Sequence, residues 1–420
     1  MTLSIALRLV AAFLWLAAGA RVNAAEPLTL SDAIRRALDT QPELRGFEYR
    51  LRAEEARVGE SGLAPAMSVG LLVEDAAGSG ARRGLESAQT TLSLSRVIEL
   101  GGKRAARVSL AEASRDRVRT ERAARQLDVT AEVARRFVET LHGRELVNLA
   151  AEVLRQSEVT RDAVDRRVRA ALAPAAERAR AEVRVAQSKL DLEHAEHELQ
   201  TARMYLAAAI GERHVTFTET LGDLYAMSDP APLDDLLARI ESTPDLAVFA
   251  DEARLRDAEM RLALSQRKPD LRAEIGVRRY EDMGDTAVVA GISVPLQSGR
   301  RARFGIDASA AERERSDVDR EAAFLKVRSR LFALYRELEH SLLEARTLRY
   351  TILPQLEEAL KRTEYAFQRG RYSYLELTDA QRELLAARQR VPDVAANYHT
   401  MRIEIERLTG EGLQAAGESP

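Results

Sequence analysis

The sequence predicts a mainly α-helical fold built twice from one unit, a strand hairpin followed by a very long helical hairpin. Apolar residues recur at alternating spacings of three and four over stretches longer than an ordinary helix, which indicates helices packed along their whole length. Much of this pattern returns 199 residues later together with its terminating glycine, Gly211 in one copy and Gly410 in the other. The repetition indicates an internal duplication.

The most regular stretch runs from Phe324 to Leu408 and predicts an antiparallel helical hairpin. Gly370 suits the left-handed backbone that ends a helix, and Ser373 can cap the next helix. The first limb, counted over 300–369, would be roughly 105 Å long. The seam consists of Phe324, Val327, Leu331, Leu334, Leu338, Ser341, Ala345, Leu348 and Ile352 in the first limb, and of Ala380, Leu384, Ala387, Val391, Val394, Tyr398, Met401, Ile405 and Leu408 in the second.

This seam predicts which side chains are buried between the helices. Leu334 and Leu384 are expected inside, whereas Arg388 is expected on a solvated face. Pro354 and Pro392 fall inside the hairpin and have no proline counterparts in the first copy, so they are expected to kink or locally open its helices.

The composition excludes several classes of protein. The 420 residues include no cysteine, which rules out disulfides, thiolate metal sites and an acylated cysteine. The net charge of −3 gives no reason to expect nucleic acid as a partner. Residues 1–24 have the pattern of a secretory signal peptide, with Arg8 before a short apolar core and Val22-Asn23-Ala24 as a cleavage site. The alternative, a membrane anchor, is disfavoured because the apolar run is short.

Four segments alternate apolar with polar or small residues and are expected to form strands. Each is about long enough to cross a bilayer when tilted, with one apolar face. The alternative is a half-buried sheet in a soluble protein, and the absence of an aromatic girdle favours it. The signal peptide and the long helices favour the membrane. The expected strands are 66–75, 88–98, 270–280 and 286–297.

These elements divide the chain into two repeats and a short tail, and 221–232 is the plausible linker between the repeats. The expected boundaries are 25–228 for the first repeat, with its helical hairpin at 101–211, 229–412 for the second, with its hairpin at 299–410, and 413–420 for the tail.

The order of elements resembles the TolC family of outer-membrane efflux channels over essentially the whole mature chain. Within that family the details look most like the branch that serves heavy-metal efflux systems of the cobalt-zinc-cadmium type. The matching stretches are Leu28-Thr29-Leu30 with Ala33 and Ala37, Ile98-Glu99-Leu100-Gly101-Gly102-Lys103-Arg104, and Ile352-Leu353-Pro354-Gln355.

The resemblance implies a homotrimer whose chains share one twelve-stranded barrel in outer-membrane lipid, continuous with a periplasmic helical tube. Four strands per chain cannot close a barrel, and an open sheet edge is not tolerated in lipid, so several chains must contribute. The implied partners are a periplasmic adaptor and an inner-membrane transporter of the RND type. The implied function is a passive exit duct, with heavy-metal cations as the expected cargo.

The resemblance also implies two kinds of site. Glu376 and Asp379 match the acidic residues that ring the closed entrance of these channels, although first-turn acids also stabilise a helix N-terminus without any further role. The hairpin tips would contact the adaptor. They comprise Arg369, Gly370, Arg371, Tyr372 and Ser373 in the second repeat, and Leu172, Ala173 and Pro174 in the first.

No catalytic, cofactor-binding or metal-binding constellation is predicted, so an enzyme is not expected. His194 and His197 are spaced to share a helix face and can hold a metal, but a solvated face is the simpler interpretation. Two other functions stay open. A duct for drug efflux or type I protein secretion would have the same fold. A periplasmic adaptor is of another class and would have one helical hairpin rather than two.

Overall fold

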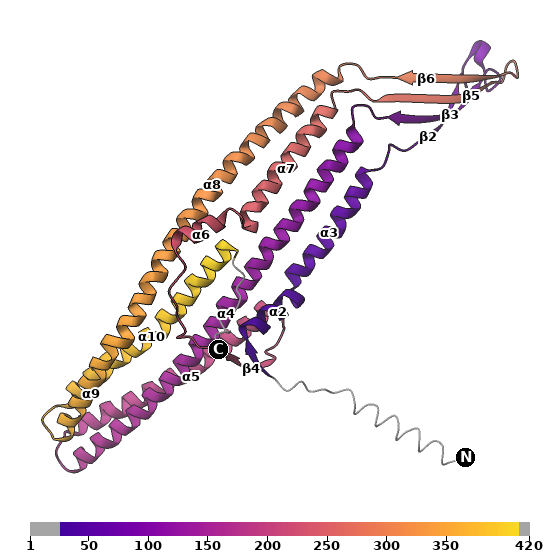
Figure 1. The fold of residues 1–420 in the computed structure, drawn as a ribbon. Helices are drawn as coiled ribbons and strands as arrows, with labels where there is room; N and C mark the ends of the chain where they lie inside the picture. The colour runs from indigo at the N-terminus through magenta and orange to yellow at the C-terminus, as the bar shows by residue number, and fades with distance from the viewer. Residues whose placement is uncertain (1–25, 411–420) are drawn as a thin grey trace, which may run out of the picture.

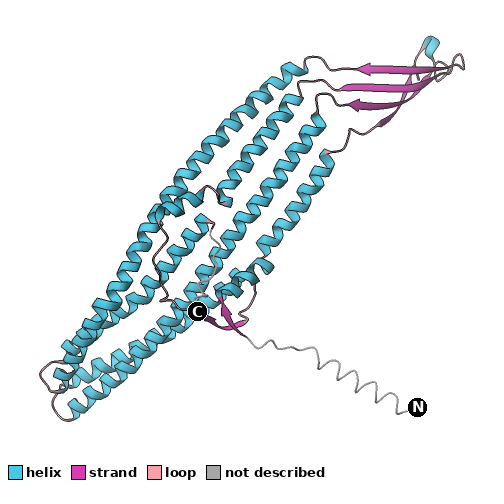
Figure 2. Cartoon of the chain, in the orientation of Figure 1, coloured by secondary structure: helices cyan, strands magenta, loops and turns pink. Residues whose placement is uncertain are grey.

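The structure, a computed structural model, describes residues 26–410 as an elongated array of long helices with a small sheet at one end (Figures 1 and 2). The expected signal peptide at 1–24 and the expected tail at 413–420 lie outside the described residues. The helices are α2 (Leu30–Thr40), α3 (Pro42–Ser61), α4 (Lys103–Arg169), α5 (Ala175–Ile210), α6 (Leu233–Ile240), α7 (Pro244–Ser265), α8 (Ser298–Thr347), α9 (Leu353–Gln368) and α10 (Tyr374–Thr409). The strands are β1 (Glu26–Thr29), β2 (Ser68–Glu74), β3 (Gln89–Ile98), β4 (Phe217–Leu221), β5 (Leu271–Tyr280) and β6 (Thr286–Ser293).

The strands at the end of the molecule form one antiparallel sheet in the order β2-β3-β5-β6. Leu92 pairs with Val277 across the centre, and Val277 pairs in turn with Val288, so their side chains share one face. This apolar face is uncovered in the single chain, and Val288 is 74% exposed. Strand β6 ends at Ser293 rather than at 297, because Pro295 has no N–H for a sheet ladder.

The helices form a single layer that gives the chain two free edges. In the half nearer the sheet the order is α8, α7, α4, α3. In the other half α8 continues into α9, and the order is α8 and α9, then α10, α4 and α5 (Figure 1). Helix α4 is continuous and about 100 Å long. It therefore runs through both halves and joins the two arrangements.

The second long limb is interrupted by a π-helical turn, Leu348–Ile352, between α8 and α9. Pro354 is the second residue after this turn. It lacks the N–H that would bond to the carbonyl four residues earlier, and the wider turn relieves the clash between its ring and that carbonyl. The expectation of a local opening is therefore confirmed here. Around Pro392, in contrast, α10 stays helical throughout, so no local opening occurs there.

The π turn moves the seam by one residue, so the prediction for Ile352 is wrong. Leu348 is 7% exposed, whereas Ile352 is 38% exposed. One extra residue in the turn rotates the following helix, and the inward positions restart one residue late. They are then Leu353, Leu356, Leu360 and Phe367.

Elsewhere the seam is confirmed, with one correction on its polar flank. Leu334 and Leu384 are buried as predicted. Arg388, expected to be solvated, is half-buried, and its guanidinium donates to Glu152 at 2.6 Å and to Glu357 at 2.9 Å. The apposition of α4 and α9 on either side of α10 supplies these two carboxylates, and no local pattern in α10 indicates them.

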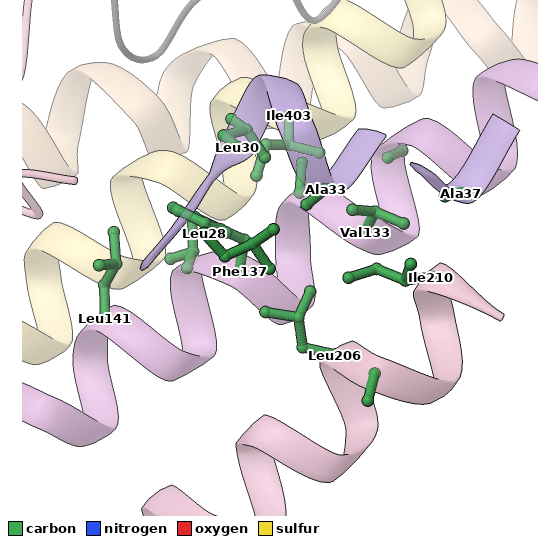
Figure 3. Close-up of a cluster of buried hydrophobic side chains, with 14 of the residues drawn as sticks. Leu28, Leu30, Ala33, Ala37, Val133, Phe137, Leu141, Leu206, Ile210 and Ile403 are labelled. Atoms are coloured by element: carbon green, nitrogen blue, oxygen red, sulfur yellow. The ribbon is translucent and has the colours of Figure 1, made fainter. Parts of the chain in front are cut away.

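A compact core lies where α2, α4 and α5 meet (Figure 3). Strands β1 and β4 pair in parallel beside it and were not predicted, because strands of four and five residues are too short to show a clear alternation. The expected linker then crosses to α10, where the Tyr398 hydroxyl donates to the Ser228 carbonyl at 2.6 Å. The side chains of this core include Leu28, Leu30, Ala33, Ala37, Val133, Phe137, Leu141, Leu206, Ile210 and Ile403.

Candidate functional site

The two helical hairpins turn at the same end of the molecule, far from the sheet, so the predicted tip residues lie near one another (Figure 1). Gly370 has a φ of +72°, which confirms the predicted left-handed turn. Its N–H donates to Phe367 and that of Arg371 to Ala366, so the helix ends in a Schellman motif.

The first tip has the same backbone turn without a glycine. Ala171 has a φ of +56°, its N–H donates to the carbonyl of Val168, and that of Leu172 donates to Arg167. An alanine in this conformation costs about 1–2 kcal/mol. Both tips are therefore built alike, and the first carries local strain.

The second tip leads into α10 through a capping box, which confirms Ser373 as the N-cap. The Ser373 hydroxyl accepts from the Glu376 N–H, and the Glu376 carboxylate accepts from the Ser373 N–H at 2.6 Å. Hydrogen bonds from the Ser373 backbone and side chain lower the pKa of Glu376, because they stabilise its ionised form. Glu376 therefore has a clear structural role within one chain.

Asp379 lies one turn further along the same helix. It is exposed, and its carboxylate lies 3.4 Å from the Arg382 guanidinium. Glu376 and Asp379 thus form a short acidic strip on the outside of the tip.

The two tips are held together by a small buried cluster and one polar clamp. Val164 and Ala181 of the first hairpin pack with Phe367 and Tyr374 of the second. Arg167 places its guanidinium 4.3 Å from the centre of the Phe367 ring and donates to the Phe367 carbonyl at 2.7 Å. These contacts make the two tips one unit.

A groove of about 530 Å³ opens between the hairpins just behind the tips. Gln381 bridges it by donating to Thr160 at 3.1 Å. Leu360 and Leu384 supply apolar walls, and Arg180 lies at its border. The groove and the tips together offer a mixed apolar and charged surface.

Among residues 26–410, no group of three or more His, Asp or Glu side chains is placed to hold a metal ion. His194 and His197 are exposed on α5, and His194 lies 3.2 Å from Glu198. In the same part of the chain, no helix combines the length and apolar character needed to cross a bilayer.

Sequence reasoning located the turns of both tips but missed the contact that joins them. The clamp of Arg167 on Phe367 joins residues 200 positions apart, and no local signal indicates it. The correspondence to Gly370 located the reversal of the first hairpin, but its positive φ at Ala171 was not predicted because no glycine marks it.

Known metal-resistance proteins are similar in sequence to most of this chain. The cobalt-zinc-cadmium resistance protein CzcC of Cupriavidus metallidurans is 29% identical over 389 residues, which cover 92% of this chain and 91% of CzcC. The nickel and cobalt resistance protein CnrC of the same organism is 24% identical over 310 residues, covering 72% of this chain and 71% of CnrC.

The fold agrees with solved structures of such channels. The crystal structure of CusC superposes with a TM-score of 0.78 at 16% sequence identity, over 91% of this chain and 92% of CusC. The sequence profile of the family described as Outer membrane efflux protein matches residues 33–212 and 238–411. Since these segments make up most of the sequence, the chain belongs to the outer membrane efflux protein family.

Proposed function

We propose that the chain is the outer-membrane channel of a tripartite pump that exports heavy-metal cations. The observation that carries the proposal is the likeness to the cobalt-zinc-cadmium resistance protein, which extends over nine-tenths of both chains rather than over one shared segment. The second relative is also a metal-resistance protein. The cation is the cargo and needs no tight site in the channel itself.

The active form in this proposal is a homotrimer. Strands β2 and β6 each have one unpaired edge in the four-stranded sheet, and an apolar face is exposed beside them. Both features are unfavourable in isolation, because unpaired backbone groups cost several kcal/mol in lipid. Three chains pairing edge to edge would close a twelve-stranded barrel in the outer membrane, with the helices continuing as a periplasmic tube.

The proposed organisation of the chain follows the same logic. Residues 1–24 direct export and are removed, 25–228 and 229–412 are the two repeats, and 413–420 form a tail. The two separate segments matched by the family profile support this division.

The proposed partners are a periplasmic adaptor, an RND-type inner-membrane transporter and outer-membrane lipid. The adaptor would meet the joined tips, where Leu172 is 71% exposed and Tyr372 lies on the surface. The predicted contact set is Arg369, Gly370, Arg371, Tyr372 and Ser373, with Leu172, Ala173 and Pro174. Glu376 and Asp379, exposed on α10 close behind the tip, would form the acidic ring at the entrance.

Two measurements on one strain test the proposal. A Gram-negative host with the cognate adaptor and transporter, but without its channel, should regain tolerance to cobalt, zinc or cadmium when this chain is expressed. The protein should fractionate with the outer membrane and migrate as a trimer on unheated gels but as a monomer after heating. Recovery of the protein in the soluble periplasmic fraction would overturn the proposal that it is a channel. Restored tolerance to drugs alone, or restored protein secretion, would overturn the metal cargo but keep the duct.

A further inference from the structure

The free edges of the helical layer each carry an apolar stripe that the single chain leaves uncovered. On α8, Leu325 and Phe332 are 56% and 54% exposed, seven residues apart. On α5, Tyr205 is 55% exposed although the Arg136 guanidinium of the same chain lies 5.2 Å from its ring centre, and the exposed Ala208 lies one turn beyond it. Within the chain α5 packs on α4, whereas α8 packs on α7 and α10, so these stripes lie on opposite edges.

The internal duplication relates these two edges to a contact that exists inside the chain, the packing of α4 against α10. Ala134, Phe137 and Leu141 of α4 correspond to Leu331, Leu334 and Leu338 of α8, each 197 positions later, and all six are buried. Helix α10 corresponds to α5 through the offset of 199 that relates Gly410 to Gly211. The contact of α4 with α10 inside the chain therefore has a counterpart, in which α8 would meet α5 of another copy.

Three polar pairs define the register of the junction inside the chain. His142 Nε2 lies 2.7 Å from the Asp393 carboxylate. Arg135 forms an ion pair with Glu404, and Arg407 lies 2.6 Å from Asp128. All three join α4 to α10 on the sheet side of the π turn, where the offset of 197 holds.

Adding 197 to each α4 residue gives its counterpart on α8, and subtracting 199 from each α10 residue gives its counterpart on α5. Each pair within the chain thereby predicts a pair between two copies. His142 with Asp393 becomes Glu339 with His194, so the histidine and the acid exchange sides. Arg135 with Glu404 becomes Phe332 with Tyr205. Arg407 with Asp128 becomes Ala208 with Leu325.

The residues in each predicted pair between copies are chemically complementary. The duplication alone does not require this, because the side chains differ between the two repeats. Only the pair of Glu339 with His194 stays polar. It joins opposite charges when His194 is protonated, and a neutral His194 can still donate a hydrogen bond to Glu339. The other two positions become apolar on both sides together. All six side chains lie at the surface of one chain, and Glu339 is half-buried.

We infer that α8 of one subunit packs against α5 of the next in this register, with Glu339 facing His194, Phe332 facing Tyr205 and Leu325 facing Ala208. The inference rests on the proposed trimer and specifies its helical interface. Within one chain Glu339 pairs with Arg336 and His194 with Glu198, so the interface would join two existing pairs into one network of four charges.

Crosslinking in membranes tests this register, and the absence of native cysteine gives a clean background. The variant His194→Cys with Glu339→Cys, treated with a short bismaleimide, should give dimer and trimer bands on heated denaturing gels. The pair His142→Cys with Asp393→Cys should react equally well but stay at monomer mass. Glu337 lies two residues from Glu339 and so faces away from it, and the pair His194→Cys with Glu337→Cys should give no multimer.

A charge exchange gives a second readout of the same contact. Glu339→His should lower the temperature at which the unheated trimer dissociates, and adding His194→Glu should restore it. A stable trimer that shows no crosslink between positions 194 and 339 would overturn the inferred register and leave the proposed function standing. A protein that forms no trimer at all would overturn both.

Discussion

The two hairpin tips have the same backbone turn, but only one of them has glycine at the left-handed position. A Cβ added at Gly370 would meet no other atom within 4 Å, so the backbone conformation alone disfavours a side chain there. Gly370→Ala should therefore lower the free energy of unfolding by about 1 kcal/mol, and Ala171→Gly should raise it by about 0.5–1 kcal/mol. Thermal unfolding of the purified variants measures both, and a stabilising Gly370→Ala would contradict the account.

The same turn underlies a functional prediction for the tip. Gly370→Val places a β-branched residue at positive φ, so the tip should be distorted while the distant sheet and the long helices are unaffected. The variant should still form trimers in the outer membrane but lose efflux. Unchanged metal tolerance would show that the tip does not contact the adaptor.

His399 makes stability depend on pH. It is buried on α10, its Nε2 donates to the Leu224 carbonyl at 2.9 Å, and Arg402 and Asp223 are its charged neighbours. Burial lowers the pKa of His399, so the folded chain keeps it neutral where the unfolded chain binds a proton. Its contribution to stability is therefore complete above the unfolded value of about 6.5 and decreases as the pH falls below it.

His399→Gln keeps a donor for the Leu224 carbonyl but cannot titrate. Lowering the pH from about 7.5 to about 5.5 should therefore lower the unfolding temperature of the wild type more than that of the variant. Other titrating groups cancel in this difference. Parallel pH profiles would show that His399 does not couple protonation to folding.

At the scale of the helices, the π turn decides which residues face inward. Leu348 is buried and Ile352 is exposed, although the unbroken seam assigned both to the interior. Leu348→Asp should cost about 3–5 kcal/mol as an unpaired buried charge, whereas Ile352→Asp should cost less than about 1 kcal/mol. Unfolding temperatures of the two variants test the shift, and equal losses would contradict it.

The second limb offers a matched pair of the same kind. Leu384→Asp should lose the trimer, because a charge would be buried between α10 and its neighbours. Arg388→Ala should cost about 1 kcal/mol, since it removes two partly exposed ion pairs from a bridge between α4 and α9. An unchanged free energy of unfolding in Arg388→Ala would show that this bridge does not stabilise the packing of the helices.

At the scale of the assembled molecule, the acidic strip at the tip would act on conduction only through symmetry. Three copies of Glu376 and Asp379 around one axis would repel one another and attract cations. That repulsion opposes the lowering of the Glu376 pKa by Ser373 within each chain. The ring would therefore be more easily protonated in the trimer than in the isolated chain.

Neutralising this ring should change conduction without changing the fold. Glu376→Gln keeps a capping-box acceptor at the same position, and Asp379→Asn removes a charge from an exposed site. In planar bilayers the double variant should lose cation preference and lose block by multivalent cations added from the tip side. Arginine at either position should weaken or reverse the preference. Identical selectivity in wild type and double variant would leave Glu376 with its capping role only.

The sequence by itself determined what depends on local order: the long helices and their seams, the alternating strands, the turn at Gly370 and the cap at Ser373. These features have periods or residue types that are visible within a few turns of chain. The tertiary structure alone decided the clamp of Arg167 on Phe367, the bridge at Arg388, the β1–β4 pair and the shift at Ile352. The first three need partners distant in sequence. The shift arises because one extra residue in a turn rotates every later side chain, while the apolar spacing still permits either register.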